Sequence, residues 1–87
     1  MNAKRKGTRV EREIKKIFEE RGLKVVRSAG SFGHADLYVE IIGHVQVKAR
    51  KEIAIYKWLE DNDAVVIKAD KQEPLIVLPL QRFLEVL

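Results

Sequence analysis

The residues of this chain that are best suited to hydrolytic chemistry are Asp36 and Lys48, with Gln46 between them. In an extended strand, successive side chains point to opposite faces, so Gln46 and Lys48 share one face of residues 45–49. By the same alternation, Asp36 lies on the polar face of residues 36–41, and we expect Leu37, Val39 and Ile41 on the opposite face to be buried. A turn at residues 42–44 would therefore bring Asp36 and Lys48 to one polar cleft.

A cleft of this kind suits the cleavage of phosphodiesters. Carboxylate and main-chain carbonyl oxygens bind a hard cation such as Mg²⁺, which activates water and offsets the charge that grows on the phosphorane. A lysine beside that water orients it, assists its deprotonation or stabilises the charge. Asp and Lys are also common on solvated strands, so the spacing alone leaves an ordinary polar strand face as an alternative.

The positive charge of the chain is concentrated at its start. The net charge is +4, and residues 1–9 contain four of the 17 Lys and Arg residues but no acid, so the other 13 cations balance the 13 acids. A basic N-terminal arm at residues 1–9 is typical of a phosphate-backbone contact, with Arg5, Lys6 and Arg9 as candidate DNA-binding residues. A solvated terminus is the alternative interpretation.

The length of the chain, 87 residues, allows one domain, residues 1–87, with a modest core and surface left for a partner subunit. No cysteine is present, so neither disulfides nor a thiolate zinc site are available. No apolar run is long enough for a membrane span. We therefore expect a soluble, cytoplasmic protein.

Hydrophobic periodicity predicts the elements that position these residues. A first helix would begin with Thr8 as N-cap and Glu11 as its capping-box partner, and end at Gly22. Glu11 and Glu13 both border its apolar stripe, so periodicity does not choose between them. The remaining elements are expected to be strands at 23–27, 36–41, 45–49, 64–67 and 75–78, and helices at 53–60 and 80–87. The order α-β-β-β-α-β-β-α predicts an α/β fold with a mixed central sheet flanked by helices.

Several short sequence motifs, in order along the chain, resemble those of a known protein family. The chain resembles the archaeal Holliday junction resolvases of the PD-(D/E)XK nuclease superfamily in Lys6-Gly7, Val10-Glu11-Arg12-Glu13-Ile14, Val26-Arg27-Ser28-Ala29-Gly30-Ser31, Ala35-Asp36-Leu37 and Val45-Gln46-Val47-Lys48. From residue 47 onward it is similar to small resolvase-like nucleases of phages and prophages. The resemblance implies a single restriction-endonuclease-like domain and a Mg²⁺-dependent endonuclease, with Mn²⁺ as a substitute, that cuts four-way or other branched DNA.

Carried over position by position, the resemblance implies a set of site residues. Glu11, Asp36 and Gln46 would bind the metal, and Lys48, Asp36 and Ser31 would be catalytic. The departure is Gln46, where the family pattern has Glu. Gln still offers a neutral oxygen but lacks the charge that holds a divalent ion. Either the enzyme is active with weaker metal affinity, or it is an inactive accessory protein that binds DNA without cutting it.

Further residues are candidates for contacts with DNA or with a second subunit. Arg27, Arg50, Lys51 and Lys57 are expected to bind backbone phosphates, with a solvated surface as the alternative. His34 and His44 are near enough in sequence to reach the cleft rim. Tyr56 and Trp58 are either stacking residues for unpaired bases or, for Trp58 in particular, core or dimer packing. Symmetric cutting of a junction predicts a homodimer. The strand at 75–78 and the helix at 80–87 are candidates for its interface or, equally, for closing the core of the monomer.

Overall fold

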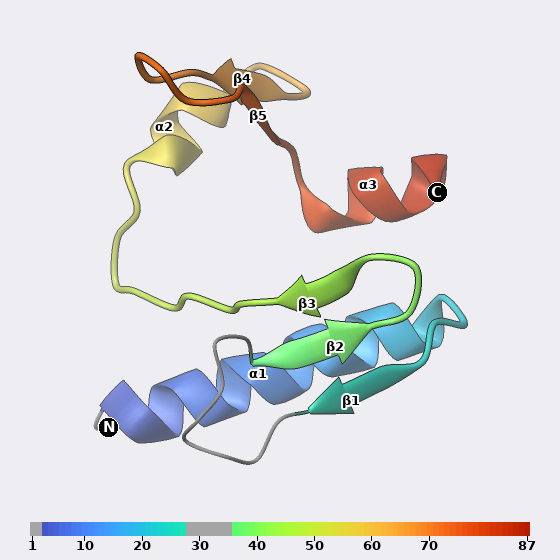
Figure 1. Cartoon of the computed structure of the whole chain (residues 1–87). Coiled ribbons are helices and arrows are strands. Elements are labelled where there is room, and N and C mark those ends of the chain that lie inside the picture. Colours follow the sequence, from blue (N-terminus) through green and yellow to red (C-terminus); the bar gives the residue numbers. More distant parts are fainter. Residues whose placement is uncertain (1–2, 28–35) are drawn as a thin grey trace. The chain divides into compact units, whose positions relative to one another are not determined.

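The computed structural model describes residues 3–27 and 36–87, with side chains described from Gly7 onward. Its elements are α1 (Ala3–Glu20), β1 (Val25–Arg27), β2 (Leu37–Val39), β3 (Gly43–Val45), α2 (Ile55–Leu59), β4 (Val65–Ile67), β5 (Leu75–Val77) and α3 (Leu80–Val86) (Figure 1). The predicted α/β class and element order are therefore confirmed. The chain divides into two compact units, Met1–Arg50 and Lys51–Leu87, which we describe separately.

Helix α1 of the first unit begins earlier than predicted. It starts at Ala3, so Thr8 lies inside the helix and the predicted N-cap and capping box are wrong. The physical reason is that Ala, Lys and Arg are strong helix formers, and a single Gly7 costs only about 1 kcal/mol in a helix. The basic residues of the first nine positions from Ala3 onward are thus part of α1. Gly22, at φ +87°, follows the helix in the left-handed conformation that favours glycine.

The three strands of the first unit form an antiparallel sheet in the order β1-β2-β3. In register, Val26 pairs with Tyr38, and Tyr38 pairs with His44. Strand β2 shows the expected alternation, because Leu37 and Val39 are buried while Tyr38 between them is half exposed. The sequence therefore identified the buried face of this strand correctly.

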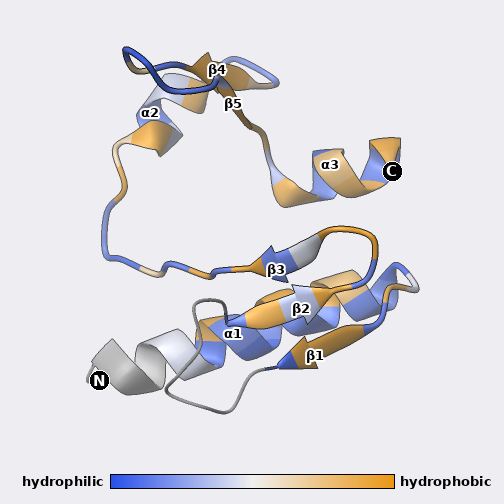
Figure 2. Cartoon of the chain, viewed as in Figure 1, coloured by the Kyte–Doolittle hydropathy of each residue, from blue (hydrophilic) through white to orange (hydrophobic). Residues whose placement is uncertain are grey.

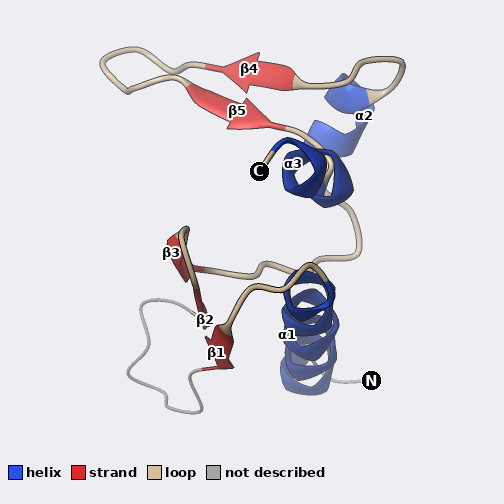
Figure 3. Cartoon of the chain, turned by 90° about the vertical axis from the view of Figure 1, so that its right-hand side faces the viewer, coloured by secondary structure: helices blue, strands red, loops and turns tan. Residues whose placement is uncertain are grey.

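Helix α1 covers one face of this sheet, as the view along the helix shows (Figure 3). The core between the two layers contains Phe18 from α1, Val25 from β1, and Leu37 and Val39 from β2, which are at most 8% exposed. The other side chains of the central register, Val26, Tyr38 and His44, are exposed. Within this unit, therefore, one sheet face forms a core with α1, and the other carries the polar residues of the sequence motif.

The strands of the first unit are shorter than predicted. Strand β2 ends at Val39, and Ile41, predicted to share the buried face, is 74% exposed with φ at +77°. The turn lies at residues 40–42, and Gly43, at φ +101°, opens β3. β3 ends at Val45 rather than at residue 49, and beyond its end the Val47 N–H donates a hydrogen bond to the Asp36 side chain. The alternation was predicted correctly, but the ends of the ladder were not.

The second unit contains α2, the antiparallel pair β4-β5 and α3. The two strands are hydrophobic and the turn between them is hydrophilic (Figure 2). Trp58 is 58% exposed, so the expectation of core packing for Trp58 is wrong in the part of the chain described here. The five-residue helix α2 is too short to bury a face, and none of its residues is buried. On α3, Leu84 is buried.

The strand pairs inside the two units are antiparallel, whereas the predicted mixed sheet contains both parallel and antiparallel pairs. Every strand pair within either unit is antiparallel, as short turns between consecutive strands require. A mixed sheet needs at least one parallel pair, and neither unit contains one within the residues described. No helix in the described part of the chain is long and apolar enough to cross a membrane.

Candidate functional site

Asp36 forms hydrogen bonds with both sequence neighbours of Gln46, Val45 and Val47. Its main-chain N–H donates to the Val45 carbonyl at 3.1 Å, and its Oδ2 accepts a hydrogen bond from the Val47 N–H at 2.7 Å. The register Leu37↔Val45, continued by one residue, places Asp36 opposite Gln46. The two motif positions that are ten residues apart in sequence thus lie next to each other, and the carboxylate itself makes the connection.

Exposed and half-buried side chains continue to alternate in the segment that follows β3, although this segment belongs to no strand. His44, Gln46, Lys48 and Arg50 are exposed, whereas Val45, Val47 and Ala49 are half-buried. Gln46 and Lys48 therefore share the exposed side of this segment, as strand parity predicted. This segment has no strand pairing. Among the described side chains, that of Asp36 binds it, through the hydrogen bond from the Val47 N–H.

Glu11 faces the sheet, and Glu13 does not. The Arg27 Nε donates to Glu11 Oε1 at 3.1 Å, with the two side chains 27% and 18% exposed, respectively. Glu13 is exposed on α1 and forms an ion pair with Arg9 at 3.9 Å. The structure thus separates the two glutamates that periodicity left equivalent, and it gives Arg27 a partner inside the unit that the sequence did not reveal.

The donor set at these positions fits a hard divalent cation. Asp36 offers its second carboxylate oxygen, Oδ1, which accepts no hydrogen bond from any residue the structure describes, and Gln46 offers an exposed amide. Glu11 is a second carboxylate, but it lies on the α1 side of the sheet with one oxygen paired with Arg27, whereas Gln46 lies on the exposed side. Oxygen donors with two formal negative charges suit Mg²⁺ or Mn²⁺, with less charge than a site in which position 46 is Glu. Among the described residues, no group of three or more His, Asp or Glu side chains is placed to hold a metal ion.

His44 lies on the same face as Gln46 and Lys48. Its ring contacts the ring of Tyr38 edge-on, with the centroids 5.3 Å apart and the planes at 74°. The contact is a cross-strand pair in register, which gives the imidazole a fixed neighbour on the exposed side of the sheet.

The other predicted site residues are placed in different ways. Arg9 and Lys48 are exposed in the first unit, and Lys51 and Lys57 are exposed in the second. Arg50 is exposed and its Nη1 donates to the Ala49 carbonyl at 2.9 Å. Ser31 and His34 lie outside the described residues, and the side chains of Arg5 and Lys6 are not described, although both lie within α1.

Sequence reasoning missed two parts of this site. The Val47 N–H is a main-chain group, and the signal for it was the register that places Asp36 opposite Gln46. The Arg27–Glu11 pair joins residues 16 apart. Its only sequence signal was that a charged residue at the end of an apolar strand needs a partner when the strand packs on a helix.

A helix on one face of an antiparallel sheet, with an acid at the start of one strand bonded into the segment that carries Gln-X-Lys, defines the class of PD-(D/E)XK nucleases. The chain matches the family of archaeal Holliday junction resolvases (Hjc) over residues 2–77, and it belongs to that family. The family consists of endonucleases that use a divalent metal to resolve Holliday junctions, and the predicted recognition, fold and enzyme class are thereby confirmed. Comparisons with curated proteins and with solved structures found no match.

Proposed function

We propose that this resolvase uses Glu11, Asp36 and Gln46 to hold Mg²⁺, and Lys48 together with Ser31 to assist cleavage. The observation that carries the proposal is the 2.7 Å bond from the Val47 N–H to Asp36, because it brings the carboxylate to the Gln-X-Lys segment. When bound, a divalent cation offsets the charge of the transition state and activates the attacking water.

The protein's own groups have separate tasks in this mechanism. Asp36 holds the segment with one oxygen and leaves the other for the cation. Lys48, on the same side as Gln46, is a three-donor ammonium that orients the attacking water and stabilises charge on the phosphoryl oxygens. Arg27 holds Glu11 on the sheet side of α1 and keeps its carboxylate from turning to solvent.

Gln46 determines how firmly the cation is held. A neutral amide oxygen replaces a carboxylate, so we infer an active enzyme that needs a higher concentration of metal than one with Glu at this position. The alternative is an accessory protein that binds junctions without cutting them. The retained acids at positions 11 and 36 and the retained Lys48 favour the active enzyme.

The test is a titration of Mg²⁺ and Mn²⁺ with a labelled four-way junction and with the matching duplex. The parent protein should cut the junction in preference to the duplex, and Gln46→Glu should shift half-maximal cleavage to roughly tenfold less metal. Gln81→Glu, which adds the same charge at an exposed position of α3, is the matched control and should leave the titration unchanged. Absence of cleavage by the parent at every metal concentration, with cleavage in Gln46→Glu, would instead establish the accessory protein.

The quaternary structure that we propose is a homodimer. Two active sites related by a twofold axis suit the two symmetric cuts of a junction. Apolar side chains exposed on β5 and at the end of α3, namely Leu75, Ile76, Val86 and Leu87, are candidates for the interface. Sedimentation at micromolar concentration, with and without junction DNA, tests this, since a persistent monomer contradicts paired cutting.

A further inference from the structure

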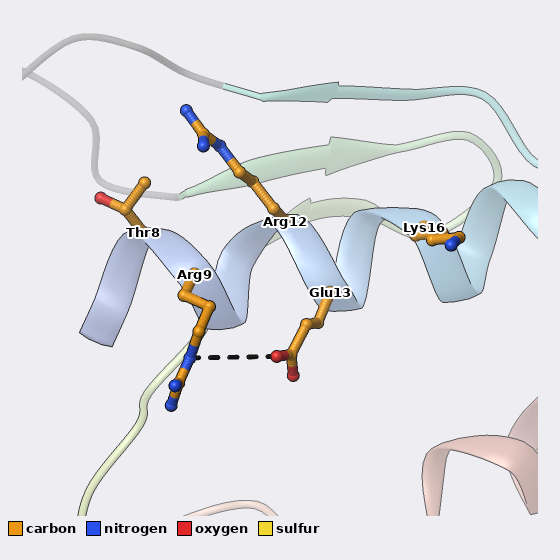
Figure 4. A pocket seen from close by; sticks show the side chains of 5 residues that line it. All are labelled: Thr8, Arg9, Arg12, Glu13 and Lys16. Carbon is orange, nitrogen blue, oxygen red and sulfur yellow. Dashed lines mark ion pairs between the residues drawn. The ribbon is translucent and has the colours of Figure 1, made fainter. Parts of the chain in front are cut away.

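The outward side of α1 carries a row of cations that is separate from the proposed site. We call Arg9, Arg12 and Lys16 the outer cationic row, and all three are exposed. Together with Thr8 and Glu13 they line a depression of about 470 Å³ on the surface of α1 (Figure 4).

Helix geometry explains why these three side chains form a row. Positions i, i+3 and i+7 lie within about one fifth of a turn of one another, since an α-helix has 3.6 residues per turn. The apolar side chains of α1 project from the other side, where Phe18 is buried and Ile14 and Ile17 are half-buried. The row therefore remains available for a partner when α1 packs on its sheet.

The charges of the row are poorly neutralised within the protein. Arg12 and Lys16 have no ion-pair partner in the portion of the chain that the structure describes. Arg9 has only an exposed pair with Glu13 at 3.9 Å, which is worth little in water. By contrast, Lys15 on the same helix is paired with Glu19 at 3.3 Å.

The dimensions of the row match a phosphate backbone. Seven residues of α-helix rise by about 10 Å. The phosphates of one DNA strand follow one another at about 3.4 Å along the duplex axis, so Arg9 and Lys16 are separated by about three phosphate steps when α1 lies parallel to that axis. Two guanidinium groups and an ammonium group at this spacing are suited to consecutive phosphates, each of which releases counterions when it is neutralised.

We propose that the outer cationic row binds consecutive phosphates of one strand in a duplex arm of the junction. This rests on DNA being the substrate, as in the proposed function, and adds a surface outside the proposed metal site. Helix α1 then bears both Glu11, which is paired with Arg27 of β1, and the exposed residues that contact phosphates. Binding of an arm thereby positions the same helix that supplies a metal ligand.

The experiment measures binding of a fluorescent four-way junction by anisotropy, in EDTA, over a range of salt concentrations. Arg12→Gln combined with Lys16→Gln should reduce the slope of log affinity against log salt by about 1.8, because each lost phosphate contact removes about 0.9. Glu13→Gln should strengthen binding at low salt, because it removes a negative charge from the row and frees Arg9. Gln is a good helix former, so α1 is expected to persist, and circular dichroism checks this.

Two control variants distinguish the effect of the outer cationic row on DNA binding from the effect of the net charge of the protein. Lys15→Gln removes a cation that Glu19 already neutralises. Arg9→Gln, a third variant of the row, should lower the slope by about 0.9. Arg82→Gln is its matched control, because Arg82–Glu85 and Arg9–Glu13 are both 3.9 Å apart, with exposures of 56% and 62% against 56% and 63%. Both controls should keep the parent slope. The proposal is overturned by a parent-like slope in the double variant, or by an equal loss of slope in the controls.

The outcome is independent of catalysis. Binding in EDTA needs no metal, so an inactive Gln46 site would leave the effect of the row unchanged. Conversely, a row without effect on the slope would leave cleavage of the junction to be tested as before.

Discussion

The carboxylate of Asp36 accepts a hydrogen bond from the main-chain N–H of Val47 at 2.7 Å, while the Asp36 N–H donates to the Val45 carbonyl at 3.1 Å. A side-chain hydrogen bond thus joins Asp36 to the segment that follows the end of β3. Gln46, between the two bonded residues, is held at this position without a hydrogen bond of its own to Asp36 among those described. The same acid therefore has a structural and a chemical task, and substitutions can separate the two.

Asp36→Asn keeps an oxygen that can accept from Val47 but removes the negative charge. We expect its free energy of unfolding to stay within about 0.5 kcal/mol of the parent, with cleavage of the junction lost. Asp36→Ala removes both, and should in addition cost about 1 kcal/mol, the usual net value of one hydrogen bond. Urea denaturation followed by circular dichroism gives the stability, and a cleavage assay in Mg²⁺ gives the activity. Asn and Ala variants of equal stability would show that the Val47 bond contributes nothing.

The Glu11–Arg27 pair is the best-buried ion pair among those described, and its strength is measurable. A double-mutant cycle with Glu11→Gln and Arg27→Gln should give a coupling energy of about 1 kcal/mol, since partial burial reduces screening. The same cycle on the exposed pair Arg9–Glu13 should give less than about 0.5 kcal/mol. Raising the salt concentration should weaken the exposed pair more than the half-buried one. Equal coupling in the two cycles would contradict the role of Arg27 as the residue that positions Glu11.

Local periodicity was enough to predict much of the fold. The alternation in β2 identified Leu37 and Val39 as core, and it continued past the end of β3 to place Gln46 and Lys48 on one exposed side. Such patterns are local, because side-chain direction depends on the backbone of the residue itself. The order of helices and strands was accessible for the same reason.

The features that were missed depend on contacts between distant residues or on small differences in free energy. The hydrogen bond between Asp36 and Val47 joins residues 11 apart, and no periodicity encodes it. The start of α1 depends on whether helix propensity outweighs one glycine, a balance of about 1 kcal/mol. Exposure of Trp58 follows from the shortness of α2, and element ends are the least predictable property of a sequence.

The two faces of β2 should respond differently to truncation. Leu37 is 1% exposed beneath α1, so Leu37→Ala should cost about 2–5 kcal/mol. This is a large part of the stability of so small a domain, and the variant should lose much of its cooperative unfolding. Tyr38→Ala, one residue further and 50% exposed, should cost less than about 1 kcal/mol and abolish the ring contact with His44. Equal destabilisation by the two variants, measured by urea denaturation, would mean that the exposed face is covered in solution.

Two glycines of the first unit should respond to alanine in opposite directions. Gly7 lies inside α1 with no atom within 4 Å of an added Cβ, so Gly7→Ala should stabilise the protein by about 0.5–1 kcal/mol. Gly43 also has space for a Cβ, but its φ of +101° is one that L-residues rarely adopt, so Gly43→Ala should destabilise it by at least about 1 kcal/mol. Both sites have space for an added Cβ, so the difference in backbone conformation alone gives the two changes in stability opposite signs. Thermal denaturation of the two variants beside the parent tests this, and a stabilised Gly43→Ala protein would show that the turn before β3 relaxes to a conformation with negative φ.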